Sequence, residues 1–308
     1  MTMPPTRSPW AARLASRLAA AKKVAPLAAA WRSADVETIR KALSGESPYS
    51  GSVKPDKGAR VAFNIASAHV PDFAKRGGRY INRYAVAALK APLGTPVSPP
   101  ADARTRIDQI LGVMTGFALQ DIHYGALELN GAGVRYYGDF CLVLKANATG
   151  DDTLLMDRNS FDLILAPLRS KTHARGAWDP VRAMREARKI SGVWGSCLHL
   201  LAACKVLDGA PNVTRRITIG AISQGVLSDE DYIEVIRTSS FDRKDVAEAR
   251  TTVGDAAAET HIGERMVSGP TPDLAALTWR RQRRQAEIAF QTAGIPVRLV
   301  IGSGRTKA

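Results

Sequence analysis

The order of short strand patterns and longer helical patterns in residues 101–308 constrains the fold most. Phe140–Leu144 is a five-residue apolar run after a Gly-Asp turn, with the length and composition of a buried strand. Thr153–Met156 is expected to be its hairpin partner, and the segments 216–222 and 295–301 are further expected strands. Because strands and helices alternate too irregularly for a doubly wound parallel sheet, we expect an α+β fold with a mixed or antiparallel sheet.

Several helical patterns lie between these strands. Apolar residues recur at helical spacing in 103–119, and a long helical region, broken near Gly192 and Gly195, is expected over 179–207. Ser228 is expected to cap a helix whose first turn carries three acidic residues, where the helix dipole favours them. A last helix is expected over 273–293, and Gly294 is expected to end it. The body is therefore expected to combine several helices with one sheet.

The first hundred residues differ from the rest in charge. They contain 16 of the 43 basic residues but only 5 of the 29 acidic ones. Helices are expected over 10–31 and 34–43, and a short strand or helix over 60–68. Residues 92–100 contain four prolines and a glycine, which is typical of a linker. We therefore expect two parts: a basic, mainly helical region in 1–100 and the α+β body in 101–308.

The basic segment 10–23 has three possible interpretations. It places Leu14 and Leu18 on one helix face and precedes the first acid, Asp35. A basic arm, a targeting leader and an alanine-rich surface helix all fit this pattern, whereas its charges interrupt the apolar stretch of a secretory signal. No apolar run reaches the roughly 18–20 residues of a membrane helix, and three cysteines fit a reducing, cytoplasmic compartment.

Familiar catalytic motifs are absent from the sequence. It has no phosphate-binding Gly-Lys-Ser/Thr loop, no G-x-G-x-x-G after a strand and no G-x-S-x-G elbow. The five histidines are dispersed and there is no H-E-x-x-H or C-x-x-C pair, so no metal site is expected. A metal-dependent nuclease would need an acid two residues before Lys145, where Val143 stands. These classes of enzyme are therefore not expected.

Three segments, 134–145, 157–161 and 258–263, follow one another in an order that resembles the motifs of ADP-ribosyltransferase-like bacterial toxin and effector domains. The resemblance implies an α+β enzyme that uses NAD, requires no metal and modifies a macromolecular target. It also implies a cytoplasmic protein, or one that is delivered into a target cell.

Matched position by position, the resemblance implies roles for five residues. Those for cofactor contact are Arg135 with Tyr136 or Tyr137, of which we favour Tyr137, and then Asn159 and Ser160; the one for catalysis is Glu259. A carboxylate that holds a ribose hydroxyl stabilises the oxocarbenium-like state as nicotinamide leaves. Residues 246–260 also follow a helical period, and in that alternative Glu259 is a solvated acid on a helix.

A second hypothesis, from a different class of protein, rests on four arginines within five residues. They are Arg280, Arg281, Arg283 and Arg284, and together with the basic N-terminal region they are suited to contact phosphates. The alternative function is therefore that of a non-enzymatic nucleic-acid-binding or phage-type structural protein. The same arginines are equally suited to pair with the acidic region 229–264. The sequence indicates no oligomeric state.

Overall fold

The computed structural model describes residues 33–44, 58–91, 102–115, 117–129, 131–149, 153–156, 159–160, 191–193 and 232–301. The strands are β1 (Arg60–Ile65), β2 (His123–Glu128), β3 (Phe140–Leu144), β4 (Thr153–Met156), β5 (Ser191–Val193), β6 (Glu234–Arg237), β7 (Val246–Thr252) and β8 (Val297–Val300). The helices are α3 (Ser33–Ser44), α4 (Val70–Ala74), α5 (Arg83–Lys90), α6 (Ala103–Thr115), α11 (Val253–Val267) and α12 (Leu274–Ala293).

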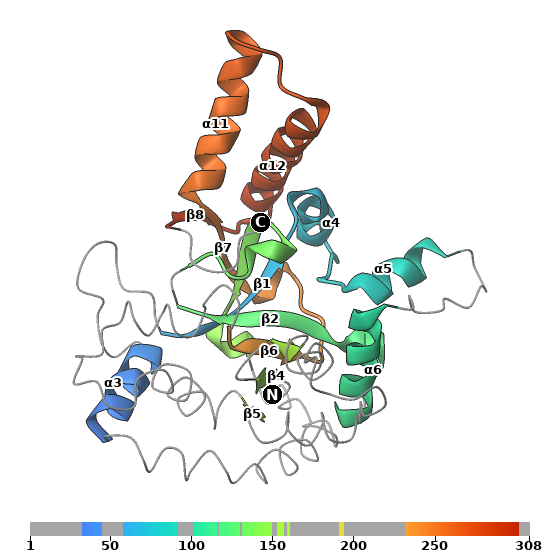
Figure 1. Cartoon of the computed structure of the whole chain (residues 1–308), viewed down its shortest axis with the longest axis vertical. Coiled ribbons are helices and arrows are strands. Elements are labelled where there is room, and N and C mark those ends of the chain that lie inside the picture. The colour runs from blue at the N-terminus through green and yellow to red at the C-terminus, as the bar shows by residue number, and fades with distance from the viewer. Residues whose placement is uncertain are drawn as a thin grey trace, which may run out of the picture.

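The described strands form one eight-stranded sheet in the order β5-β4-β6-β2-β1-β3-β7-β8 (Figure 1). Neighbouring strands are antiparallel except β7 and β8, which are parallel. The mixed sheet with several helices confirms the expected α+β class.

The core lies where α4 and α12 pack on one face of this sheet. Phe63 of β1 contacts Phe241 with ring centroids 4.8 Å apart, and Phe241 also contacts Phe73 of α4. Phe290 of α12 meets Phe140 of β3 at 5.2 Å. Each of these five phenylalanines is at most 2% exposed, so the central strands and the two helices share one apolar core.

A helical hairpin connects the two parallel strands. Thr252 caps α11 through its hydroxyl, and Asp273 caps α12 through its carboxylate. Gly294 follows α12 with a φ of 71°, a left-handed conformation that glycine adopts without strain and that turns the chain into β8. The expected last helix, its end at Gly294 and the final strand are therefore confirmed. In Figure 1, α11 and α12 rise together from one end of the sheet.

Strand pairing differs from expectation at β4. Thr153–Met156 is a strand, but it pairs with β5 and β6 instead of β3. Since β3 already has β1 and β7 as neighbours, both of its edges are occupied. The expected hairpin between β3 and β4 is therefore wrong, although both strands were expected.

The structure bears on two expected helices. Ser191–Val193 is a strand that coincides with the break expected near Gly192 in the helical region 179–207, and it pairs with β4. Glu234–Arg237 is a strand close after Ser228, which leaves little chain for the helix expected there. Ser228, the rest of 179–207 and the expected elements at 10–31 and 216–222 lie outside the described residues.

The sheet joins the two expected parts of the chain. β1 precedes residue 100, yet it lies between β2 and β3, which follow that residue. Residues before and after the expected linker therefore contribute to one sheet and one core, while the segment 92–101 itself lies outside the described residues. None of the described helices combines the length and the hydropathy needed to cross a membrane.

Candidate ligand-binding cavity

A cavity of about 920 Å³ opens where the end of β1, the segment 79–90, α6 and the turn Arg135–Tyr137 meet. This volume is within the range of small-molecule sites, roughly 300–1,000 Å³. All six tyrosines of the described residues line it, and we call it the tyrosine cavity. They are Tyr80, Tyr84, Tyr124, Tyr136, Tyr137 and Tyr232.

A buried carboxylate organises one side of the tyrosine cavity. Asp108 of α6 is 1% exposed and accepts hydrogen bonds from the hydroxyls of Tyr84 and Tyr124, at 2.5 and 2.6 Å. The Nε of Arg104, one helical turn earlier, lies 2.8 Å from the same carboxylate. Its guanidinium stacks over the Tyr124 ring at 3.7 Å. Four side chains from three segments are thereby held in fixed orientations.

The α5 side of the cavity is fixed to α6 by polar contacts. Arg83 makes two hydrogen bonds to Asp102, at 2.9 and 3.0 Å, and a third to Thr105 at 2.6 Å. Asn82 caps α5 with its side-chain oxygen, and its amide nitrogen donates to the carbonyls of Leu119 and Ile122. This wall is therefore held in place before any ligand binds.

Burial keeps the phenol groups of the cavity protonated. Loss of solvation raises the pKa of five of the six lining tyrosines above the ordinary value near 10. They are Tyr80, Tyr84, Tyr124, Tyr137 and Tyr232. At neutral pH these hydroxyls remain protonated, and those of Tyr80, Tyr84 and Tyr124 donate to the carbonyl of Asn64 and to Asp108 within the protein.

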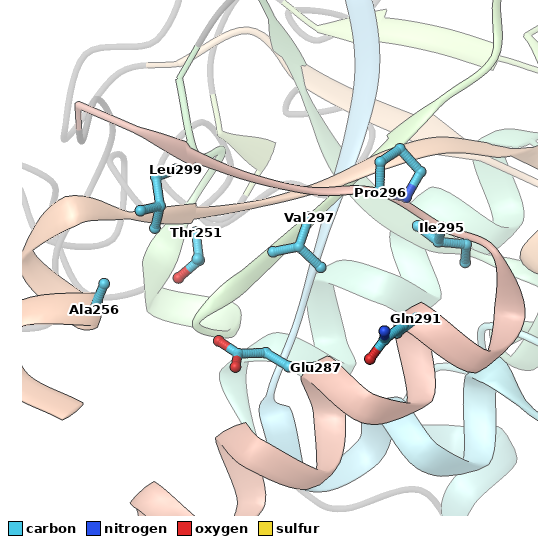
Figure 2. Close-up of a pocket in the computed structure, with 8 residues that line it drawn as sticks. All are labelled: Thr251, Ala256, Glu287, Gln291, Ile295, Pro296, Val297 and Leu299. Atoms are coloured by element: carbon cyan, nitrogen blue, oxygen red, sulfur yellow. The ribbon is translucent and has the colours of Figure 1, made fainter. Parts of the chain in front are cut away.

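A second recess lies between α12 and β8 and is shown in Figure 2. Its volume is about 420 Å³, and Glu287 and Gln291 extend into it from α12 toward Thr251 and Val297. Glu287 is the single charged residue among its lining residues, and none of them is aromatic. The recess therefore offers far less for recognition than the tyrosine cavity.

The residues expected to contact a cofactor are only partly brought together. Tyr137 and Asn159 line the tyrosine cavity. Arg135 is directed toward α11, where it forms an ion pair with Asp255. The backbone N–H of Ser160 donates to the buried Glu234 at 2.8 Å. Two of the four expected residues therefore line the cavity, and the other two are not among its lining residues.

Glu259 lies on α11 and is not among the residues that line the tyrosine cavity. Its carboxylate is 3.3 Å from the Nε of Arg283 and 2.5 Å from the Nε of Arg284. Glu259 is only 6% exposed, so the helical interpretation is right while the expected solvation is wrong. The two arginines form ion pairs with its carboxylate.

The four clustered arginines of α12 do not form one free basic face. Arg283 is fully buried, with Asp139 and Glu259 each 3.3 Å from its guanidinium and Glu287 at 3.6 Å. The expectation that Arg283 contacts phosphate is therefore wrong. Its guanidinium pairs with acidic side chains instead.

The other three arginines of this cluster differ from one another in their surroundings. Arg284 is paired with Glu259, and Arg280 packs against Gly263 of α11. Only Arg281 and Arg284 are exposed, so the charge available to an external phosphate is much smaller than the sequence suggests.

Of the residues that build the cavity, Tyr137 and Asn159 were expected at a site, whereas Arg104 and Asp108 were not. Arg104 and Asp108 are four residues apart on one helix, and this spacing is a recognisable ion-pair signal. The tyrosines carry no such signal, because they come from five separate segments between residues 80 and 232. Only the folded sheet brings them together.

No family model, characterised protein or solved structure matches this chain. Within the described residues, no group of three or more His, Cys, Asp or Glu side chains is placed to hold a metal ion. The tyrosine cavity is therefore the feature of the described residues that bears most directly on function.

Proposed function

We propose that the tyrosine cavity binds a dinucleotide of the NAD type. The observation that supports this best is the gathering of six tyrosines around one cavity of about 920 Å³. Stacking of a base on an aromatic side chain contributes about 1–3 kcal/mol. The volume exceeds what a single base and ribose need, which favours a ligand with two ring systems.

Basic side chains at the cavity support an anionic ligand. Arg79 and Lys90 are exposed lining residues and have no carboxylate partner among the described residues. Arg83 also lines the cavity, but Asp102 holds its guanidinium. Two cations are thus available for a diphosphate.

The geometry supports binding better than group transfer. A transferase would need a carboxylate free to reach the ribose, and the lining carboxylates among the described residues are Asp72 and Asp108. Asp72 is paired with Lys75, and Asp108 already accepts from Tyr84, Tyr124 and Arg104. The proposal is therefore dinucleotide binding, with Tyr137 and Asn159 as contact residues.

We expect Arg79→Ala and Lys90→Ala each to weaken NAD binding by roughly tenfold or more, because each removes a charge-assisted hydrogen bond to the diphosphate. Isothermal titration calorimetry with NAD and ADP-ribose measures the change. Arg281→Ala is the matched control, since Arg281 is an exposed arginine outside the cavity. The proposal fails if the protein binds neither ligand, or if Arg281→Ala weakens binding as much as Arg79→Ala does.

A further inference from the structure

β8 is an edge strand of the sheet. Among the described residues it pairs with β7 alone, and Figure 1 shows it at the margin of the sheet. Val297, Leu299 and Ile301 are 37%, 59% and 85% exposed, so the chain leaves these apolar side chains largely uncovered. An exposed apolar edge strand is a template for pairing with another strand, and proteins normally protect such an edge.

The pairing with β7 determines which backbone groups of β8 point outward. The N–H of Ala249 donates to the carbonyl of Pro296, and Ala249 is in register with Val297. In a parallel pair with this register, every second residue of β8, beginning with Pro296, directs its backbone polar groups toward β7. The N–H and C=O groups of Val297 and Leu299, and of Ile301 directly after the strand, therefore point away from the sheet.

The side chains of these three residues form an apolar row along the edge. Side chains alternate between the two faces of a strand, and Figure 2 shows Val297 and Leu299 at the recess beside α12. Arg298 belongs to the opposite face, where its Nε lies 2.9 Å from the carboxylate of Glu248. Because this ion pair holds the arginine over the sheet, its charge does not protect the outer edge in the way that edge charges often do.

A second β8 strand fits this edge in the antiparallel orientation. With Leu299 opposite its own copy, Val297 lies opposite Ile301, and the outward N–H and C=O groups of both strands form hydrogen-bonded pairs. Arg298 then lies opposite Val300. The next register that keeps these hydrogen bonds places Arg298 opposite its own copy, and like charges directly opposite are destabilising. The register on the other side leaves Val297 without an apolar partner.

We propose that the protein forms a homodimer in which two β8 strands pair antiparallel about a two-fold axis at Leu299. Each copy supplies the same surface, as a two-fold interface requires, and the sheet continues from one copy into the other. One short strand pair buries less area than most permanent interfaces, so we expect a reversible dimer. Leu299 and its neighbours in β8 do not line the tyrosine cavity, so this proposal is independent of the proposed function.

Sedimentation velocity over a range of protein concentrations measures the dimer and its dissociation constant. Leu299→Lys places two ammonium groups opposite each other, and we expect it to weaken the dimer by roughly a hundredfold or more. Leu274→Lys is the matched control, because it makes the same change at a 79% exposed residue in the first turn of α12, the end of that helix farther from β8. This variant is expected to leave the dissociation constant unchanged.

Cysteine cross-linking tests the register by a gain that misfolding does not produce. The Cα atoms of a hydrogen-bonded antiparallel pair are about 5.5 Å apart, a distance that a disulfide spans. We therefore expect Leu299→Cys to give a covalent dimer under mild oxidation. Arg298→Cys is the comparison, since in this register its two copies are roughly 7–8 Å apart, too far for a disulfide. The wild-type chain, with its three native cysteines, gives the background.

The outcomes decide the proposal directly. A dimer that Leu299→Lys dissociates and Leu299→Cys links covalently supports it. A monomer at every concentration overturns it and leaves the edge to a partner of another kind. A dimer that is as tight in Leu299→Lys as in Leu274→Lys also overturns it, as does cross-linking of Arg298→Cys in preference to Leu299→Cys.

Discussion

Arg283→Ala is expected to lower the free energy of unfolding by about 3–5 kcal/mol, because it leaves buried carboxylates without their cation. Arg283 is 0% exposed and forms ion pairs with Asp139, Glu259 and Glu287. Its guanidinium also lies over the ring of Phe140, 4.8 Å from the ring centroid. Urea unfolding followed by circular dichroism measures the loss. Arg283, on α12, thereby joins that helix to α11 and to Asp139, the residue before β3.

The pH dependence of that variant provides a second check. The charge of Arg283 lowers the pKa of Glu287, so without Arg283 the pKa of Glu287 in the folded protein rises further above its unfolded value. Burial already raises the pKa of Glu287, and the charge of Glu259 adds to this. Folding then requires proton uptake as pH rises past the unfolded pKa, so the deficit of the variant is largest at neutral pH and shrinks near pH 4.

Arg281→Ala is the control for Arg283→Ala. Arg281 lies on the same helix and is exposed, so its loss is expected to change the stability by less than about 0.5 kcal/mol. Equal effects of the two substitutions, or a loss below 1 kcal/mol for Arg283→Ala, would show that the buried ion cluster does not hold α11 and α12 against the sheet.

Gly138→Ala is expected to destabilise the fold by about 1–3 kcal/mol or more and to abolish ligand binding. A Cβ at Gly138 would lie 2.1 Å from the backbone carbon of Ile65 and 2.4 Å from the backbone nitrogen of Ala66. The turn that carries Tyr136 and Tyr137 would therefore have to move away from the end of β1, and two walls of the cavity would separate.

Gly254→Ala is the matched control for this glycine. Gly254 lies in the first turn of α11, and the nearest atom to an added Cβ is the Thr252 hydroxyl at 3.6 Å. Here alanine is expected to stabilise the protein by about 0.4–1 kcal/mol, because it restricts the unfolded chain without a clash. Thermal unfolding and NAD titration of both variants test the pair; full ligand affinity in Gly138→Ala would contradict the role of this close contact.

The elements with strong local patterns could be predicted from the sequence. Phe140–Leu144 is a strand because five apolar residues follow a turn, and α12 begins at its capping aspartate and ends at its glycine as expected. Pairing could not be predicted, because β4 finds its partners in β5 and β6, which come from later in the chain. The sequence of a strand does not indicate which strand it will hydrogen-bond to when that partner lies far away in the chain.

The candidate site was harder to predict for a related reason. The resemblance to ADP-ribosyltransferases identified Tyr137 and Asn159, which do line the cavity. It also identified Glu259, whose carboxylate forms ion pairs with two arginines. A run of arginines in a sequence suggests a surface, whereas helix geometry directs Arg283 inward and Arg281 outward. Only tertiary structure distinguishes these neighbours.

The position of β1 restricts how this polypeptide can be divided. It hydrogen-bonds to β2 on one side and to β3 on the other, although both follow it in the chain by more than fifty residues. A fragment that starts after residue 100 would lack the strand between them, and two exposed edges would face each other across an empty position. The change in charge near residue 100 is therefore not a domain boundary. The basic N-terminal third cannot be exchanged or removed as a module, because β1 belongs to it.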